Sequence, residues 1–379
     1  MKFDFTEEQK LIKKTSREFA EIELMPDVIK RDEEKIWPKE AIRKMAELGF
    51  LGMMVTSEWN GGGMDTISYV IAMEEISRID ASAAVVMSVN NSLVCYLIEK
   101  YASTFLKEKY LKQLTTGKKL GAFSLSEPQS GSDASNMNTF AKFDGTSYIL
   151  NGTKNWVTNG INSDYIIVFA LTEKGIGHKG ISCFIIEKGW PGFNLGKPEN
   201  KLGIRASDTC ELYFDNVIIP KENIIGEEGD GFKIALATLD GGRIGIASQA
   251  LGIAQASLDA SINYAKERIQ FSKPISENQI IQYKIADIAI ELESARLLTY
   301  KAAYMKDNKQ SFSKYASMAK VYASEVAMKA STQCVQIHGG YGYMRESGVE
   351  RLMRDAKITQ IYEGTSEIQR LVIAKDLLK

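Results

Sequence analysis

Histidine and cysteine are scarce in this chain of 379 residues, which contains two histidines and four cysteines. No two cysteines have the spacing of metal ligands, and two histidines cannot complete a zinc site without them. The four cysteines are therefore interpreted as small buried apolar residues. They are Cys95, Cys183, Cys210 and Cys334. We expect no metal site, so demanding chemistry must come from an organic cofactor or from carboxylates.

An excess of charge of either sign is also absent. The sequence holds 47 lysine and arginine residues against 48 aspartate and glutamate residues, for a net charge of -1. This balance gives no footprint for binding nucleic acid or an anionic membrane. No apolar run approaches the length of a membrane span, and residues 1–8 lack the apolar segment of a signal peptide. We therefore expect a cytoplasmic protein with neither a membrane span nor a nucleic-acid partner.

The pattern of apolar and polar residues changes twice along the sequence. A chain of this length is expected to form two or three domains. Residues 1–120 have helical periodicity, and a capping box at residues 6–9 opens the first helix. Short β-rich runs separated by glycine, asparagine and aspartate fill residues 121–225 and predict an antiparallel sheet. From about residue 229, long periodic stretches predict a bundle of antiparallel helices, and the run at residues 240–243 is expected to open or interrupt one of them.

A GxGxxG pattern at residues 175–180 matches the dinucleotide-binding fingerprint. A β-rich run follows it where that fingerprint requires a helix to begin. We therefore interpret the pattern as a glycine-rich hairpin loop, with His178 facing solvent.

The run at residues 361–370 (IYEGTSEIQR) places one carboxylate on a glycine joint directly before a helix. Helical spacing predicts that this helix begins near Ser366 with Thr365 as its cap, and Gly364 lets the backbone bend sharply. With so little histidine available, Glu363 is a candidate proton acceptor. The alternative is an acid that complements the helix dipole, and spacing alone favours this second interpretation.

The same run resembles the catalytic segment of the acyl-CoA dehydrogenase family, and four other stretches agree with that family in the expected order. They are AFSLSEP (122–128) with GSD (131–133), NGTKNWVTNG (151–160), LDGGRIG (239–245) and QIHGGYG (336–342). The resemblance covers nearly the whole chain, and MSVNNSL (87–93) is most similar to the short-chain, butyryl-CoA branch. It implies an α+β multidomain fold with an N-terminal α-helical domain (1–120), a middle antiparallel β-barrel domain (121–228) and a C-terminal four-helix bundle (229–379).

The function implied by the resemblance is FAD-dependent α,β-dehydrogenation of a short saturated acyl-CoA to the trans-2-enoyl-CoA, a step of fatty acid metabolism. Glu363 would remove the α-proton while the flavin takes the β-hydrogen as hydride. The Glu363 backbone N–H and a ribityl hydroxyl would hold the thioester carbonyl oxygen. Electrons would pass to an electron-transferring flavoprotein, and the implied assembly is a homotetramer in which each FAD bridges two subunits.

The resemblance also assigns binding residues along the chain. The residues implied near the flavin ring are Phe123, Leu125, Ser126, Ser132, Trp156 and Thr158. Those implied at the FAD pyrophosphate and adenosine of a neighbouring subunit are Arg268, Phe271, Gln279, Gln336, Gly339 and Gly340. Two further FAD-binding residues are implied, Thr365 and Glu367. Substrate contacts are implied for Ser132, Phe232, Asp240, Arg243 and Gly364. Phe123 lacks the hydroxyl that many relatives carry there. In the isovaleryl-type branch the base occupies the position of Gly242, so Glu363 has no competitor.

Several alternatives to this function stay open. A branched short-chain acyl-CoA dehydrogenase would share the same residues. An acyl-CoA oxidase would discharge electrons to oxygen, but such chains are usually much longer. A non-catalytic scaffold or nucleic-acid-binding relative would lack the base or carry a basic face, and neither feature is present. A decarboxylating glutaryl-CoA enzyme is disfavoured because residues 88–95 offer no arginine for a distal carboxylate.

Overall fold

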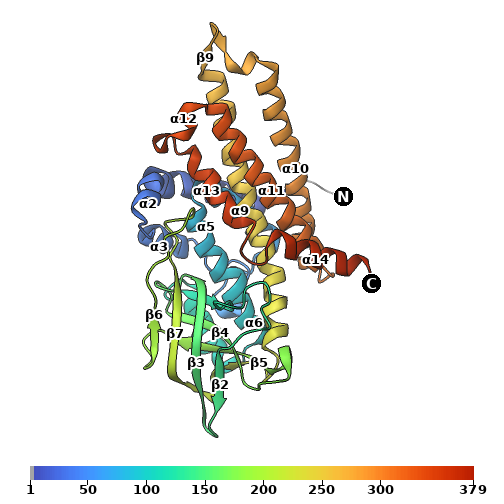
Figure 1. Ribbon diagram of the computed structural model, residues 1–379. Helices are drawn as coiled ribbons and strands as arrows, with labels where there is room; N and C mark the ends of the chain where they lie inside the picture. The colour runs from blue at the N-terminus through green and yellow to red at the C-terminus, as the bar shows by residue number, and fades with distance from the viewer. Residues whose placement is uncertain (1–3) are drawn as a thin grey trace.

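The computed structural model describes residues 4–379 and shows three parts that follow one another along the chain (Figure 1). Helices form the first part, strands the second and long helices the third, so the predicted α+β order is confirmed. The limits of the domains at residues 120 and 228 stay a prediction. The prediction that residues 1–8 form no signal peptide falls partly on residues 1–3, which lie outside the described residues.

The first part is helical from its predicted capping box onward. The Thr6 hydroxyl accepts a hydrogen bond from the Gln9 backbone N–H, and the Gln9 side chain accepts one from the Thr6 N–H, which confirms the cap. The helices are α1 (Glu7–Phe19), α2 (Val28–Glu34), α3 (Lys39–Glu47), α4 (Thr66–Ile79), α5 (Ala81–Ser88), α6 (Tyr96–Tyr101), α7 (Thr104–Leu106) and α8 (Lys112–Thr115), with π-helical segments at Ala20–Leu24, Val89–Cys95 and Lys107–Leu111 and 3₁₀ turns at Met25–Asp27 and Ser57–Trp59.

One helix, Ala81–Tyr101, is long and apolar enough to cross a membrane by length and composition, with a mean hydropathy of 1.6. The expectation that no apolar run approaches this length was therefore wrong. It comprises α5, the π-helical segment Val89–Cys95 and α6, and 94% of its most apolar window is buried inside the protein. It contacts α4, α9 and β1, and a helix surrounded on every side is apolar on every side.

The second part is one eight-stranded sheet with the order β6-β7-β3-β2-β4-β5-β8, and β1 pairs with β4. The strands are β1 (Gly121–Ser124), β2 (Phe140–Phe143), β3 (Ser147–Thr158), β4 (Tyr165–Leu171), β5 (Ile181–Glu187), β6 (Phe193–Leu195), β7 (Thr209–Pro220) and β8 (Ile224–Ile225), with 3₁₀ turns at Gly177–Gly180 and Lys221–Asn223. The sheet is mixed, because β1 and β2 both pair in parallel with β4, whereas an antiparallel sheet was expected. A long loop, residues 125–139, replaces a hairpin between β1 and β2. Among the described residues the end strands β6 and β8 do not pair, so hydrogen bonds do not close the sheet into a barrel.

The central strands β4 and β5 are buried on both faces, which explains their unbroken apolar runs. Ile166 and Val168 enter a core inside the β domain, whereas Ile167 and Phe169 enter the main core shared with the helices. The strand β5 also follows directly after the 3₁₀ turn Gly177–Gly180, which confirms that the GxGxxG pattern is a loop. The sheet is thereby fixed to the helical parts on one face.

The third part contains the long helices α9 (Gly231–Glu267), α10 (Gln279–Asp307) and α11 (Ser313–His338), which pack against one another. The shorter α13 (Val349–Thr359) packs against α9 and α11, so the predicted four-helix bundle is confirmed with three long members and one short one. The other elements are α12 (Gly340–Tyr343), α14 (Ser366–Leu377), β9 (Ile269–Gln270), β10 (Lys273–Pro274) and 3₁₀ turns at Ile275–Glu277 and Arg345–Ser347.

The helix α9 runs without interruption through residues 240–243, so the expected start or break there was wrong. Glycine costs a helix interior only about 1 kcal/mol relative to alanine. The glycines of α9 permit close contact instead: a Cβ atom at Gly252 would collide with the Glu74 carbonyl of α4, and one at Gly245 would lie 2.7 Å from the Tyr69 hydroxyl. Tertiary packing therefore outweighs the local preference.

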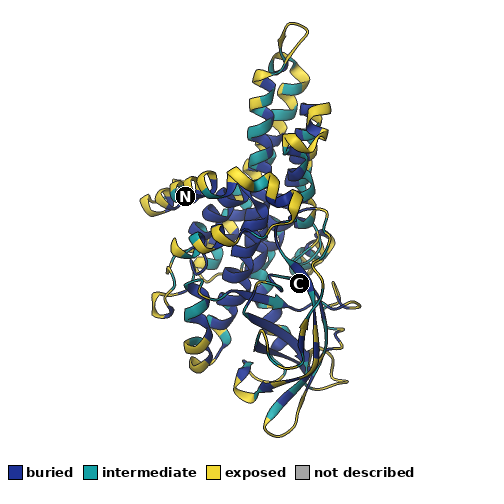
Figure 2. Ribbon diagram, turned by 90° about the vertical axis from the view of Figure 1, so that its left-hand side faces the viewer, coloured by how far each residue is buried: buried dark blue, intermediate teal, exposed yellow. Residues whose placement is uncertain are grey.

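The distal ends of α9 and α10 project beyond the rest of the molecule. Figure 2 shows exposed residues concentrated at this tip, while the helices below it are buried. The tip carries large apolar side chains in solvent, including Phe271 at 92% exposure, Ile280 and Tyr283. Such a surface is typical of an interface with another chain.

Candidate active site

The turn that carries Glu363 has an unusual backbone. Glu363 has φ +52° and Gly364 has φ +92°, so two consecutive residues lie in the left-handed region, which a residue other than glycine seldom adopts. The turn ends at α14, where the Thr365 hydroxyl accepts a hydrogen bond from the Ile368 N–H. The predicted cap at Thr365 and the predicted helix start at Ser366 are therefore confirmed.

Three helices hold this turn in place. The Gln369 side chain on α14 donates to the carbonyls of Glu363 (3.1 Å) and Gly364 (2.9 Å). Lys320 on α11 donates from Nζ to the same Gly364 carbonyl at 2.7 Å. The Tyr362 hydroxyl donates to the Gln249 side chain on α9. A strained backbone persists only where its surroundings determine it, and these contacts supply that constraint.

The Glu363 carboxylate faces α9 and lacks hydrogen-bond donors within residues 4–379. Its Oε2 atom is buried without a hydrogen-bond partner among the described residues. A Cβ atom at Gly242 would collide with this oxygen, so the carboxylate occupies the space that a side chain on α9 would fill. Burial raises the pKa of the Glu363 carboxyl to about 7, although Lys320 and Arg243 lower it. A carboxyl with a pKa near neutrality is suited to accept and release a proton.

The walls beside this carboxylate come from the first part of the chain. Leu93 in the π-helical segment lies so close to Gly242 that a Cβ atom there would be 2.8 Å from its Cδ2. On the buried α4 and α5, the Tyr69 hydroxyl donates to Ser88 Oγ at 3.2 Å. Burial also raises the pKa of Tyr69, so the phenol stays neutral. Side chains from the first part of the chain are therefore packed closely against α9 at Gly242 and Gly245.

Arg243 and Asp240 form an ion pair within α9, and serines of α11 hydrogen-bond to both partners. The Arg243 guanidinium donates to Asp240 at 2.5 Å and to Ser317 Oγ at 3.2 Å, and Ser313 donates to Asp240 at 2.8 Å. Arg243 is buried, so it contributes a fixed positive charge beside Glu363. Phe232, another residue for which a substrate contact was implied, packs against His178 with ring centroids 5.5 Å apart.

The residues assigned to the flavin ring gather on β1, β3 and the loop between β1 and β2. Trp156 sits at an irregularity in the β3–β7 pairing with φ +60° and 62% exposure, so its indole lies open to solvent. Phe123 packs against Phe169 of the core, with ring centroids 5.1 Å apart. Leu125 is buried, Ser126 and Thr158 are partly buried, and Ser132 is exposed.

A buried ion pair anchors the loop between β1 and β2. Lys154 on β3 donates to Glu127 at 2.7 Å and to the Leu125 carbonyl at 3.0 Å, and its side chain is completely buried. Glu127 also accepts from the backbone N–H groups of Asn138 and Thr139. Sequence reasoning did not single out this pair, although both residues lie within the family motifs.

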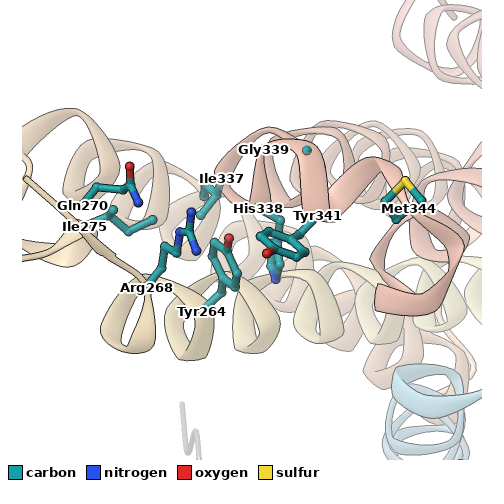
Figure 3. Close-up of a pocket in the computed structure, with 10 residues that line it drawn as sticks. Tyr264, Arg268, Gln270, Ile275, Ile337, His338, Gly339, Tyr341 and Met344 are labelled. Carbon is teal, nitrogen blue, oxygen red and sulfur yellow. The ribbon is translucent and has the colours of Figure 1, made fainter.

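The remaining assigned residues lie at the far end of α9. A pocket of about 500 Å³ lies there, and its lining residues are drawn in Figure 3. The Arg268 guanidinium lies 5.4 Å from the Tyr341 ring centre, and Tyr264 stacks on His338. Gly339 and Gly340 line this pocket, and Gln336, Phe271 and Gln279 are exposed near it in the sequence. Gly242 and Arg268 are separated by about 39 Å along α9, at about 1.5 Å per residue. One chain therefore does not bring the two assigned halves of the FAD site together.

Thr365 and Glu367 lie at the start of α14, Thr365 partly buried and Glu367 exposed. Sequence reasoning missed Lys320, Gln369 and Tyr69, all of which surround the Glu363 turn. A signal for Lys320 was present: it falls at helical spacing among Ala316, Ala323 and Ala327, which predict a buried stripe. The four cysteines are buried, as interpreted.

The three-part fold and the buried carboxylate together define an enzyme, and comparison with known proteins gives its class. Family models match the N-terminal domain of acyl-CoA dehydrogenases at residues 6–118, the middle domain at 122–217 and the C-terminal domain at 229–378. The chain belongs to the acyl-CoA dehydrogenase family, which consists of flavoprotein oxidoreductases. The family recognised from five sequence motifs is thus confirmed.

Individual relatives cover the chain from end to end. The rat (Rattus norvegicus) short-chain specific acyl-CoA dehydrogenase is 52% identical over 99% of this chain and 91% of its own length. The solved structure of butyryl-CoA dehydrogenase from Megasphaera elsdenii is 47% identical and superposes with a TM-score of 0.99 over all of both chains. A chain of a structure described as the electron transferring flavoprotein of Acidaminococcus fermentans is 48% identical with a TM-score of 0.99 over all of both chains. The branch expected from residues 87–93 is the one named in the first two relatives.

Proposed function

We propose that the protein catalyses FAD-dependent α,β-dehydrogenation of short saturated acyl-CoA thioesters to trans-2-enoyl-CoA. The observation that carries the proposal is the Glu363 carboxylate, whose Oε2 atom is buried without a hydrogen-bond partner within residues 4–379 and whose pKa is raised to about 7. The relatives named as short-chain specific and butyryl-CoA dehydrogenases support the substrate class.

Glu363 acts as the base that accepts the α-proton of the thioester. Burial makes its carboxylate more basic than one in water, which brings it closer to the acidity of a polarised α-C–H group. The backbone N–H of Glu363 makes no hydrogen bond within residues 4–379, so it is free to donate to the thioester carbonyl where enolate charge develops. The base and one oxyanion donor thus come from the same residue.

The exposed groups of this chain suit a bound FAD, which supplies the acceptor for the β-hydrogen. The open Trp156 indole offers a flat apolar surface for the ring system. Arg268 forms no ion pair within residues 4–379, so its guanidinium is available for a pyrophosphate, and Gly339 and Gly340 present open backbone beside it.

The distance between these two halves supports a shared cofactor. An FAD molecule that contacts both the Trp156 and the Arg268 side chain requires a second copy of the chain, because about 39 Å of α9 separates the two regions within one copy. The exposed apolar tip around Phe271 supplies a surface for that copy. We propose a homotetramer in which each FAD bridges two subunits.

Assembly and cofactor binding should then be linked, because a ligand that spans an interface stabilises the assembled state. Arg268→Ala is expected to lower FAD content and to shift the tetramer toward smaller species in size-exclusion chromatography with light scattering. A stable monomer that retains stoichiometric FAD would contradict the shared site.

The proposed limit on substrate length rests on side chains packed against α9 near the base. Leu93 lies close to Gly242, and Tyr69 and Ser88 lie close to Gly245. We expect kcat/KM to be highest for acyl chains of about four to six carbons and to fall beyond about ten, because each methylene that does not fit forfeits about 1 kcal/mol. A maximum at about twelve carbons would overturn the short-chain assignment and leave the dehydrogenase chemistry intact.

The experiment that tests the chemistry is anaerobic bleaching of the flavin with butyryl-CoA. The wild-type holoenzyme is expected to bleach, and Glu363→Gln is expected to bind the thioester without bleaching. Reoxidation should be slow in air and fast with an electron-transferring flavoprotein, the acceptor proposed from the Acidaminococcus structure. A Glu363→Gln enzyme that bleaches at the wild-type rate would remove Glu363 from the mechanism.

A further inference from the structure

Lys320 is a lysine whose side chain is completely buried. It lies on α11 in a stripe of small buried residues formed by Ala316, Ala323 and Ala327. Burying an ammonium group is costly unless the surroundings satisfy it. A helix that needed only packing at this position would carry an apolar side chain, so the lysine calls for an explanation.

The only protein group that accepts a hydrogen bond from Lys320 within residues 4–379 is the Gly364 carbonyl, at 2.7 Å. Lys320 has no carboxylate oxygen within 4.0 Å of Nζ in the same part of the chain, so it forms no ion pair. Gly364 directly follows Glu363, and its carbonyl orientation is set by the left-handed backbone of both residues. The buried cation is therefore attached to the peptide that joins the base to α14.

We infer that Lys320 is a positioning residue for the base: its hydrogen bond to the Gly364 carbonyl holds the left-handed turn that turns the Glu363 carboxylate toward Gly242. Gln369 donates to the same carbonyl, so two donors from two helices fix one oxygen. The inference rests on the proposed role of Glu363 as the base. It adds a residue that neither touches the substrate nor belongs to the five motifs.

The charge of Lys320 gives the inference a signature that packing alone would not produce. The groups that face Glu363 are Lys320 from α11, Arg243 from α9 and Tyr69 from α4, with Tyr362 beside it in the turn. Arg243 is already paired with Asp240. No carboxylate within residues 4–379 contacts Lys320 directly. Burial lowers the pKa of Lys320 to about 7, while the negative charges of Glu363 and of Glu367 on α14 raise it, so Lys320 carries its charge across the acid limb below that pH.

The sign of the effect follows from these charges. A nearby cation favours the ionised carboxylate, so Lys320 lowers the pKa of Glu363 from the value that burial alone would produce. Removing the cation should raise that pKa. Glu363 must be ionised to accept a proton, so the acid limb of the kcat/KM profile should move to higher pH.

The test compares Lys320→Met, which removes both charge and donor, with Lys320→Gln, which keeps a donor without charge. Lys320→Met holoenzyme is expected to reduce its flavin with butyryl-CoA at least about tenfold more slowly at pH 7, with its acid limb about one unit higher. Lys320→Gln should recover rate at high pH and keep the shifted limb. The matched control is Lys329→Met, on the exposed side of α11, where Lys329 pairs with Glu291 at 2.5 Å; it should match the wild type in both measurements.

Each outcome separates this inference from the proposed function. Normal flavin reduction by Glu363→Gln would overturn the function. An inactive Glu363→Gln together with wild-type rate and acid limb in Lys320→Met would overturn the inference alone. A Lys320→Met enzyme that fails to fold leaves Lys320→Gln to decide, and an unshifted acid limb in that variant would show that Lys320 is merely structural.

Discussion

Two buried lysines each lie near a glutamate in this protein, and the two pairs are built in opposite ways. In the β domain, Lys154 contacts Glu127 directly at 2.7 Å, and backbone N–H groups satisfy the rest of the carboxylate. In the bundle, Lys320 donates to a backbone carbonyl, and Glu363 Oε2 is left without a partner. Both lysine side chains are completely buried, so burial alone does not distinguish the pairs.

The difference appears in the acidity of the two carboxyl groups. Burial raises the pKa of Glu127, but Lys154 and the N–H groups of the loop more than offset it and leave the pKa below its usual value. Burial dominates at Glu363, and its pKa rises to about 7. A carboxylate satisfied by its neighbours stabilises a loop, whereas one held close to a cation without touching it remains available for chemistry.

Exchange of the two acids for amides should separate these roles most strongly. Glu363→Gln is expected to lower the rate of flavin reduction by roughly three or more orders of magnitude while the protein stays folded, because an essential proton acceptor is lost. Glu127→Gln should retain the reduction step wherever it retains FAD. Stopped-flow reduction with butyryl-CoA measures both, and equal losses in the two variants would contradict the comparison.

Removal of the paired lysine should affect stability rather than chemistry. Lys154→Met leaves Glu127 buried without its counter-charge, and we expect a loss of about 3–5 kcal/mol in the free energy of unfolding. The double variant Lys154→Met/Glu127→Gln should recover part of this loss because no buried charge remains. Urea unfolding at fixed FAD concentration measures the cycle, and additive losses would show that the ion pair is not a unit.

Gly242 offers a way to disturb the Glu363 carboxylate while leaving the Lys154–Glu127 pair intact. Gly242→Ala places a methyl group where Glu363 Oε2 now lies and 2.8 Å from Leu93 Cδ2, and the flexible ends of both side chains are expected to move aside. Displacement of a catalytic group by about 1 Å lowers rates by about 10- to 100-fold, with little change in the unfolding free energy. Gly241→Ala is the control, since the nearest atom to its Cβ would be Lys306 Nζ at 3.7 Å.

The pH dependence should report Glu363 alone. Its carboxyl must lose a proton to act as a base, so kcat/KM is expected to fall about tenfold per pH unit below about 7. The same raised pKa means that the acid favours folding below its usual pKa, and that this contribution is lost as the pH rises through about 7. Glu363→Gln should therefore gain stability relative to the wild type in alkaline solution, measured by thermal melts, and Glu127→Gln should not.

Local features of the fold were predictable because neighbours in the sequence decide them. The capping box at Thr6 and the cap at Thr365 depend on hydrogen bonds that span three residues. The hairpin loop at residues 175–180 followed from the β-rich run beside it. The parallel pairing of β1 with β4 was missed because it joins strands separated by about 40 residues, and no local signal encodes it.

The candidate site was predictable only in part. The family motifs led to Glu363, and the structure shows that its surroundings suit a base. The expected helix break at residues 240–243 was wrong, since contacts with α4 and the Glu363 turn stabilise glycine within α9. The apolar length of Ala81–Tyr101 was missed as well, because it reflects burial on all sides.

The sequence by itself determined the order of helical and β parts, the membership in a family and the identity of one carboxylate, because periodicity, caps and motifs are written in nearby residues. Only the tertiary structure decided that this carboxylate would be buried without a partner, that Lys320 would hold the carbonyl beside it, and that the two halves of the cofactor site would lie at opposite regions of α9. The physical reason is that desolvation, charge and distance depend on which distant segments fold together. The identity of a residue as lysine does not reveal whether its side chain will be buried or exposed.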